Sequence, residues 1–342
     1  MRKLASIQRV LAVEPIPGAD VIVATRINGW QCVTKKGEFS PGDLGVFFEI
    51  DAIPPDEKAF QFLWTPKGEA LGSVPRPERF RIRTMRLRGC LSQGLLMPLR
   101  VVGLPTDLDE GTDVTDQLGV GKYEPPLPSG ATDIRGPFPA GVPRTEEMRI
   151  QSMPRIVEEL NGLSYVVTLK CDGASATFLI DPDDGEFHAC SRNYSIRQGA
   201  GGYWKVADAL ELEARIRSVD GRYALQGELC GPGVHKNRLG LDDLAWFVFD
   251  AYDLVEHRHL KHDERVALCE QLDLVSVPVI EEGEAFAHDQ ASLLELAEGR
   301  YPGTRNEREG LVVRSRQGIT SPTLGKRLSF KVISNRYLLR QS

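Results

Sequence analysis

The sequence predicts an α+β protein of two domains, a small β-barrel followed by a larger domain of antiparallel strands and helices. Three observations lead to this class. The chain has 342 residues, more than one hydrophobic core usually holds. Short strand-like segments fill its first third, whereas helices and strands mix in the remainder. Between these parts, residues 121–144 are rich in proline and glycine and carry no sustained period. We therefore expect domains at 1–120 and 145–342, with 121–144 as a linker.

The N-terminal part contains few stretches long enough for a helix. Strand patterns bounded by turn residues occur at 9–20, 21–39, 41–50, 79–89 and 92–99. This spacing fits a small closed β-structure of the oligonucleotide/oligosaccharide-binding (OB) type. A purely structural β-domain is the alternative.

One segment of this β-domain is strongly basic. Residues 76–89 hold six arginines and a single acid. Arg79, Arg81 and Arg83 alternate with Phe80 and Ile82, so a strand here would have one basic and one apolar face. We expect the basic face to contact nucleic acid.

Composition excludes several classes of protein. With 41% hydrophobic and 26% charged residues, the chain is neither disordered nor a coiled coil. No apolar run approaches the roughly 20 residues that cross a bilayer, and the first residues lack the apolar core of a signal peptide. The six cysteines form no C-x-x-C pair, which favours reduced thiols in the cytoplasm. The net charge of −6 argues against non-specific wrapping of nucleic acid.

The C-terminal part mixes both element types. Helical patterns are expected at 145–150, 153–160, 203–219, 262–272 and 288–300. Strands are expected at 165–169, 176–180, 223–231, 244–254, 309–315 and 327–333. The first two strands are predicted to form a hairpin around the turn Asp172–Gly173, which places Lys170 at a strand end.

Other strands in this part also carry charges inside apolar runs. A buried strand tolerates a charge only when it is paired or takes part in function. Together with the Lys-x-Asp-Gly turn at Lys170, the charged positions suggest one convergent site, and they are Arg192, Glu228, Glu309 and Lys331.

These residues fall in segments that resemble the motifs of the covalent nucleotidyltransferases, the superfamily of polynucleotide ligases and mRNA capping enzymes. The segments appear in the superfamily's order: KCDGAS (170–175), SRN (191–193), GELCGPG (227–233), AWFVFD (245–250), EGLVVR (309–314) and SFKVIS (329–334). The chain ends eleven residues after Lys331, so we expect no C-terminal OB domain of the kind found in DNA ligases and capping enzymes. With its β-domain at the N-terminus, the chain resembles the RNA ligase family typified in Deinococcus.

The resemblance implies that Lys170 is the nucleophile that takes AMP from ATP and releases pyrophosphate. A lysine attacks phosphate only as a neutral amine, so its pKa must fall from about 10.4. Partial burial, a metal-bound nucleotide and a nearby cation are the expected causes, and Lys331 is the cation we nominate. Lys331 would also hold the nucleotide phosphate.

The remaining roles also follow from the resemblance. Glu228 and Glu309 would bind a divalent metal, Mg or Mn, and Glu228 also the ribose. Trp246 or Phe247 would stack on adenine, and the alignment favours Trp246. Other implied positions are Asp172 in catalysis, Leu169 and Gly173 at the nucleotide, and Arg192 at phosphates of the nucleotide and the nucleic acid.

The sequence departs from the family in its fifth motif, which usually carries two lysines spaced two apart. Ile333 stands in the second position, and Lys326 or Arg327 is a candidate substitute. Two other signals point elsewhere: residues 257–262 contain three histidines but fit a solvated turn, and the glycine-rich 231–237 lacks the context of a P-loop. His235, Lys236 and Asn237 in that stretch are left open as lining the mouth of the site.

The sequence thus predicts a monomeric, cytoplasmic, ATP-dependent RNA ligase. It would join 3′-hydroxyl and 5′-phosphate ends of RNA or an RNA-containing duplex through a lysyl-AMP intermediate. The alternatives are a DNA ligase, a GTP-using capping enzyme, or a non-catalytic RNA-binding OB protein with a degenerate transferase domain.

Overall fold

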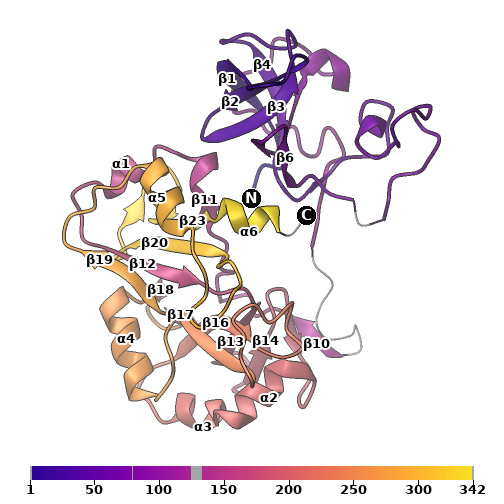
Figure 1. The fold of residues 1–342 in the computed structure, drawn as a ribbon. Coiled ribbons are helices and arrows are strands. Elements are labelled where there is room, and N and C mark those ends of the chain that lie inside the picture. Colours follow the sequence, from indigo (N-terminus) through magenta and orange to yellow (C-terminus); the bar gives the residue numbers. More distant parts are fainter. Residues whose placement is uncertain (1, 79, 125–132, 341–342) are drawn as a thin grey trace. The chain divides into compact units, whose positions relative to one another are not determined.

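A computed structural model describes residues 2–78, 80–124 and 133–340 of the chain. They form a mixed α+β protein (Figure 1) that divides into two compact units. The first unit comprises Met1–Pro125, Gln151–Pro154 and Leu338–Ser342, and the second comprises Pro126–Ile150 and Arg155–Tyr337. Gln151–Pro154 and Leu338–Ser342 lie in the range predicted for the second domain, but they group with the first unit. A single boundary along the chain does not describe this division.

The first unit is built on a five-stranded antiparallel sheet in the order β3-β2-β1-β4-β8. Its strand β1 is long because it serves two neighbours: residues 5–9 pair with β4, and after a bulge residues 12–15 pair with β2. This curled sheet confirms the expected OB-type barrel. The strands of the unit are β1 (Ala5–Pro15), β2 (Ile22–Ile27), β3 (Trp30–Lys35), β4 (Leu44–Phe48), β5 (Ala52–Ile53), β6 (Thr84–Leu87), β7 (Cys90–Gln93), β8 (Leu95–Pro98) and β9 (Gly121–Lys122).

Strand β7 bends into β8 at Gly94, whose φ is +122°. A Cβ at this position would lie 2.5 Å from the Phe47 ring, so only glycine fits the bend. The barrel interior is apolar, and its fully buried side chains include Ile7, Val46, Phe48 and Phe60.

The second unit contains two further sheets. One has seven strands in the order β10-β15-β14-β13-β16-β17-β18, and the other has five in the order β11-β23-β20-β12-β19. The first comprises β10 (Ile134–Pro137), β13 (Ala174–Ile180), β14 (Phe187–Cys190), β15 (Tyr194–Ile196), β16 (Tyr223–Cys230), β17 (Ala245–Asp253) and β18 (Arg258–His259). The second comprises β11 (Met148–Arg149), β12 (Tyr165–Lys170), β19 (Val279–Gly283), β20 (Gly310–Ser315) and β23 (Ser329–Ile333), and a separate pair is β21 (Thr320–Ser321) with β22 (Lys326–Arg327).

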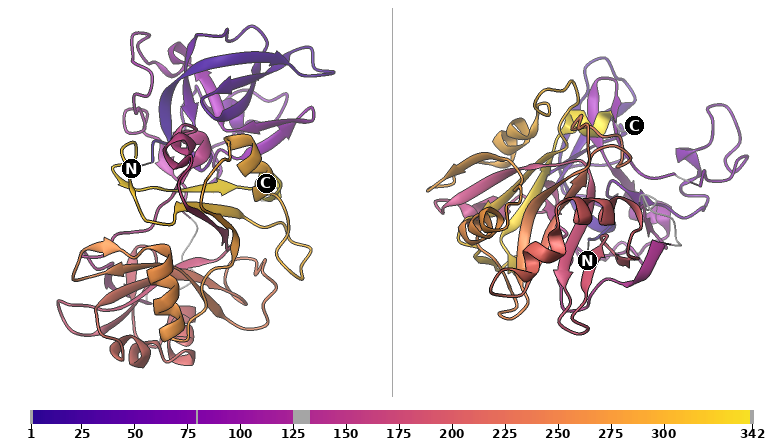
Figure 2. Two further views of the ribbon diagram at one scale, coloured as in Figure 1. Left: turned by 90° about the vertical axis from the view of Figure 1, so that its left-hand side faces the viewer. Right: turned by 90° about the horizontal axis from the view of Figure 1, so that it is seen from below.

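Helices α2 (Gly201–Ala209), α3 (Leu212–Arg217) and α4 (His262–Gln271) cover one face of the seven-stranded sheet (Figures 1 and 2). Their buried side chains join those of β13, β14, β16 and β17 in one apolar cluster. The other helices are α1 (Ile156–Leu160), α5 (Gln290–Ala297) and α6 (Asn335–Leu339). No helix among the described residues has the length and apolar character that crossing a membrane requires.

The hairpin predicted around Asp172–Gly173 is wrong. Strand β12 belongs to the five-stranded sheet and β13 to the seven-stranded sheet, so the Asp-Gly turn carries the chain from one sheet to the other. Gly173 is tightly packed there, because a Cβ would lie 2.3 Å from the Leu229 carbonyl oxygen. The glycine thus allows β16 to approach the turn.

Three other predictions are corrected by the packing. The helix expected at 145–150 is strand β11, which pairs in parallel with β23. The helix expected at 203–219 breaks into α2 and α3 at Glu211, whose φ is +48°. The described part of the predicted linker forms β9 and β10, and Phe138 and Val142 lie in an apolar cluster with Leu179.

Candidate active site

Lys170 and Glu309 meet at the ends of two neighbouring strands. In the register of β12 with β20, Lys170 lies opposite Gly310, and Glu309 immediately precedes that glycine. Lys170 Nζ lies 2.9 Å from Glu309 Oε2, and the two side chains are only 22% and 17% exposed. The sheet therefore brings together two residues that lie far apart in the sequence.

Tyr301 fixes the backbones of this pair. Its hydroxyl donates to the Lys170 carbonyl oxygen at 3.0 Å and accepts the Glu309 N–H at 3.1 Å. The side chain is 1% exposed, so both hydrogen bonds are shielded from water. Sequence reasoning missed Tyr301, because it lies outside the strands and no periodic pattern singles it out.

Gly310 allows β23 to run close beside the pair. Its φ is +149°, and a Cβ would lie 2.1 Å from the Val332 carbonyl oxygen. Any other residue would push β23 away from β20. The Glu309–Gly310 dipeptide thus combines a functional carboxylate with the only residue type that fits next to it.

Glu228 faces the same charges from the other sheet. It lies on β16, opposite Ser175 on β13 and Phe247 on β17. Burial, opposed by Lys170 and reinforced by Glu309, raises the pKa of Glu228 to about 7. Two carboxylates thus influence the half-buried Lys170 from different sheets, and carboxylate oxygens are the ligands that suit a hard divalent cation. The donor set therefore fits the metal expected from the sequence.

The Lys170 amine is stabilised in its charged form. Burial by itself lowers the pKa of Lys170, but Glu309 and Glu228 outweigh burial and raise it above its ordinary value. The sequence-based expectation of a lowered pKa included a metal-bound nucleotide among its causes, and the protein by itself does not lower the pKa of Lys170. The sequence placed Glu228 and Glu309 at the same site as Lys170, but it did not weigh their effect on the pKa of the lysine.

Asp172 is held by His235 and Arg238, two side chains of the loop that follows β16. His235 Nδ1 lies 3.2 Å from Oδ1, and Arg238 Nε donates to Oδ2 at 2.9 Å. Burial alone would raise the pKa of Asp172, but the His235 hydrogen bond and the nearby cations outweigh it and lower the pKa. Asp172 therefore anchors the loop to the Lys170 turn. The sequence left His235 open as a site residue and missed Arg238.

The preference for Trp246 as the adenine-stacking residue is wrong. Trp246 is 2% exposed and packs edge-on against Phe178, in the cluster beneath the helices. Phe247 lies on the opposite face, directly across from Glu228. It shares an apolar cluster with Leu169, which precedes Lys170. Strand alternation, which the sequence alone did not resolve, thus favours Phe247.

Lys331 lies on the same face of its sheet as Lys170. In the antiparallel register Lys331 opposes Val312, which opposes Thr168, and Lys170 is two residues further along β12. Ile333, two residues further along β23, opposes Gly310, the residue that opposes Lys170. The position of the missing second lysine is therefore apolar and buried.

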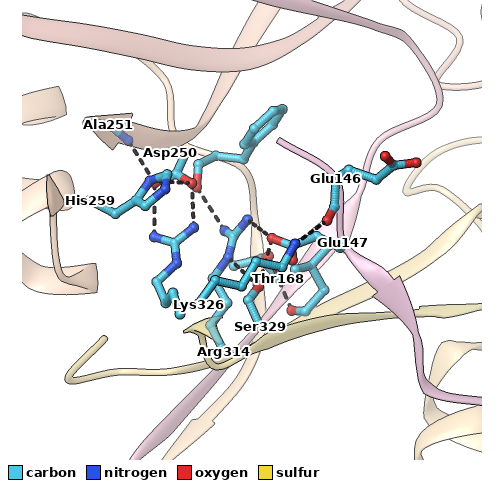
Figure 3. A network of polar contacts seen from close by, with 12 residues as sticks. Glu146, Glu147, Thr168, Asp250, Ala251, His259, Arg314, Lys326 and Ser329 are labelled. Atoms are coloured by element: carbon cyan, nitrogen blue, oxygen red, sulfur yellow. Dashed lines mark hydrogen bonds and ion pairs between the residues drawn. The ribbon is translucent and has the colours of Figure 1, made fainter. Parts of the chain in front are cut away.

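The two candidate substitutes for that lysine differ in their surroundings (Figure 3). The Lys326 amine donates to the Glu146 carbonyl oxygen at 2.8 Å. Arg327 forms a buried ion pair with Asp250. Nearby, Arg314 donates to the Phe249 carbonyl of β17 and to Glu147, so this network joins the two sheets. The ion pair with Asp250 argues against Arg327 as the substitute, and Lys326 stays a candidate.

Arg192 lies in the turn between β14 and β15, at the same end of the seven-stranded sheet as Glu228. Cys190 pairs with Thr177, while Ser175, two residues nearer that end, pairs with Glu228. The Arg192 side chain is 45% exposed and pairs with Glu146 at 3.2 Å. It is therefore accessible to a phosphate.

The basic strand expected in the first unit does not form as predicted. Arg79 lies outside the described residues, and β6 begins only at Thr84. The Arg81 guanidinium lies 4.0 Å above the centre of the Tyr123 ring, and its Nε is 3.5 Å from Asp51. Of the three predicted arginines, only Arg83 is described as exposed.

Comparison with known proteins agrees with this arrangement. An RNA ligase family model matches residues 163–333, and an OB-fold domain model matches residues 4–99. No curated protein sequence matches the chain.

Three solved structures of the RNA ligase of Naegleria gruberi resemble the chain, each covering 99% of both chains. A mutant with ATP and Mn has 34% identity and a TM-score of 0.85. A mutant with AMP and Mn has 34% identity and a TM-score of 0.86. The enzyme with PPi has 33% identity and a TM-score of 0.86. Together with the Lys170–Glu309–Glu228 constellation, these matches show that the chain belongs to the RNA ligase family.

Proposed function

We propose that the chain is an ATP-dependent RNA ligase that joins 3′-hydroxyl and 5′-phosphate ends through an AMP bound covalently to Lys170. The observation that carries this proposal is the ion pair of Lys170 with Glu309, with Glu228 facing it from the second sheet. The ATP, AMP, PPi and Mn of the related structures support the same chemistry.

In the first step Lys170 Nζ attacks the α-phosphorus of ATP. A P–N bond forms between Lys170 and the α-phosphorus. The bond from the α-phosphorus to the oxygen that bridges to the β-phosphate breaks, and pyrophosphate leaves. Because the amine must first lose a proton, the carboxylates that stabilise the ammonium oppose this step. Bound Mn or Mg would supply positive charge beside Glu228 and Glu309. Such a metal would neutralise the charge of the two carboxylates, and they would then no longer favour the ammonium form of Lys170.

The other residues orient the nucleotide. Phe247 offers an aromatic face for adenine beside Glu228. Lys331 on β23 supplies a point charge for phosphate. Arg192, at the turn after β14, supplies a planar guanidinium fork for the same purpose. AMP then passes to the RNA 5′-phosphate, and a 3′-hydroxyl attacks that phosphate and expels AMP.

The finer substrate and cellular properties follow from the resemblance. We infer that the substrate is a break held in a duplex with RNA on the 3′-hydroxyl side. We further infer a monomeric, cytoplasmic enzyme.

Lys170→Ala tests the proposal. The variant should lose labelling by radioactive ATP, yet still seal a nick that already carries AMP, because the lysine is consumed only in the first step. Lys205→Ala, an exposed lysine on α2 of the same unit, is the matched control and should label normally. Undiminished labelling of Lys170→Ala would refute the assignment. Labelling of the wild type by GTP instead of ATP would favour a capping enzyme.

A further inference from the structure

A long insertion connects the last two strands of the first unit's barrel. In chain order, β4 and β8 are the last two strands of the five-stranded sheet, and residues 49–94 lie between them. In OB folds, oligonucleotides bind at the face of the second and third strands and at the loops beside it, including the loop between the fourth and fifth strands. This insertion occupies that loop.

The insertion ends in a hairpin of β6 and β7 that lies against β3. Gln31 Nε2 on β3 donates to the Leu91 carbonyl oxygen at 2.9 Å. The Val33 N–H, also on β3, donates to Ser92 Oγ at 3.0 Å. The hairpin is therefore anchored beside the strand that OB folds use for recognition.

The first strand of this hairpin, the residue before it and the turn after it expose both basic and apolar side chains. Met85 and Leu87 are 47% and 37% exposed and, being two apart on β6, share one face. Arg83, Arg86 and Arg88 are also exposed. Arg86 donates to the Gly89 carbonyl oxygen of its own turn, and no ion pair with any of the three arginines is present among the described residues.

Three exposed arginines thus lie within six residues of one another, on a chain whose net charge is −6. Elsewhere in the unit, exposed Arg9 and Arg26 pair with Glu110 and Glu14. Guanidinium forks match the oxygens of a phosphodiester, and neighbouring aliphatic side chains can pack on riboses or unstacked bases. The surface is thus complementary to a nucleic-acid strand.

We propose that the β6–β7 hairpin binds the RNA substrate. Arg86, Arg88 and the adjoining Arg83 would contact the phosphodiester backbone, and Met85 and Leu87 would contact sugars or bases. The inference rests on the proposed function and names the element of the first unit that holds the RNA. It replaces the Arg79–Arg81–Arg83 strand expected from the sequence, because Arg81 is engaged with Tyr123 and Asp51.

The first test removes the charge of the hairpin. Arg83, Arg86 and Arg88 are replaced together by Ser in the full chain, and affinity for a nicked RNA duplex with a 5′-phosphate is measured by fluorescence anisotropy across a salt series. We expect affinity to fall about tenfold or more, and the slope of log Kd against log salt to drop by roughly two, since each lost phosphate contact removes about 0.7–0.9. A matched control replaces Lys3, Arg9 and Arg100, three exposed cations of the unit that lie outside the insertion, by Ser. The control should change affinity much less.

The second test concerns the apolar face. Met85→Ser with Leu87→Ser should weaken binding while leaving the salt slope unchanged, because no phosphate contact is lost. The control pair is Leu11→Ser with Val21→Ser, whose side chains are 57% and 73% exposed elsewhere on the barrel. This control should bind as the wild type does.

Labelling by ATP without RNA is measured on every protein, because it reports the transferase site and folding separately from RNA binding. If the wild type is not labelled, the proposed function fails, whereas the binding comparison still decides the role of the hairpin. Unchanged affinity and slope in the arginine variant would overturn the inference. So would an equal loss in the lysine-containing control, since a general loss of charge would then explain both.

Discussion

Replacing Tyr301 with phenylalanine removes one oxygen atom and breaks two hydrogen bonds at the ends of β12 and β20. The hydroxyl joins the Lys170 carbonyl to the Glu309 N–H, at 3.0 and 3.1 Å. The ring keeps its packing, because phenylalanine has the same shape. The variant therefore tests whether the alignment of Lys170 with Glu309 depends on this hydroxyl.

The size of the effect follows from burial. Each hydrogen bond contributes about 0.5–1.5 kcal/mol net, and a buried group left unpaired costs about 1–3 kcal/mol. With Tyr301 only 1% exposed, we expect unfolding free energy to fall by about 2–3 kcal/mol. If about half of this loss appears in the activation barrier, adenylylation slows roughly tenfold.

The assay is single-turnover transfer of AMP from ATP to the protein, with urea unfolding measured in parallel. Tyr165→Phe is the matched control, because Tyr165 also lies on β12 and its hydroxyl donates to Glu281 at the other end of the strand. The control should lose stability but keep its adenylylation rate. Equal adenylylation rates in the two variants would refute the role given to Tyr301.

Three further predictions address charge, stacking and pH. Glu309→Gln and Glu228→Gln should each slow all three transfers, most strongly at limiting metal, because glutamine keeps the shape and loses the charge; a wild-type rate for either at limiting metal would contradict its metal role. Phe247→Ala should raise the KM for ATP several-fold, whereas Trp246→Phe should mainly lower stability; the reverse result in steady-state kinetics would restore Trp246 as the stacking residue. Burial raises the pKa of Asp250, but its arginine partner outweighs burial and holds that pKa well below its usual range. The stability it provides is therefore complete above the unfolded value near about 4 and is lost as the pH falls through the folded value. Asp250→Asn should destabilise the protein by about 3–5 kcal/mol at pH 7, and this difference should shrink in urea titrations at lower pH; a constant difference would contradict the ion pair.

The sequence alone was enough to predict the features that depend on the pattern of neighbouring residues. The α+β class, the OB-type barrel and the strands that carry Lys170, Glu228, Glu309 and Lys331 could be predicted, because each strand shows a charge within an apolar run. The order of the motifs then identified the family. Local patterns were thus enough to place these residues in one constellation.

Features that depend on pairing between distant segments could not be predicted. The Asp172–Gly173 turn looks like a hairpin, and only the register shows that it connects two sheets. The face of Trp246 is set by the pairing of β17 with β16, and the contacts of Tyr301 and Arg238 join loops to strands far away in sequence. The raised pKa of Lys170 arises in the same way, from carboxylates on other strands.

Mapping the AMP attachment site tests the central claim most directly. The wild-type protein is incubated with ATP and Mn, digested, and its peptides are sequenced by mass spectrometry. The account predicts one adduct with the mass of AMP, bound to Lys170 through an acid-labile bond, and absent when ATP is omitted. An adduct on another residue, or no adduct while RNA is still sealed, would contradict it.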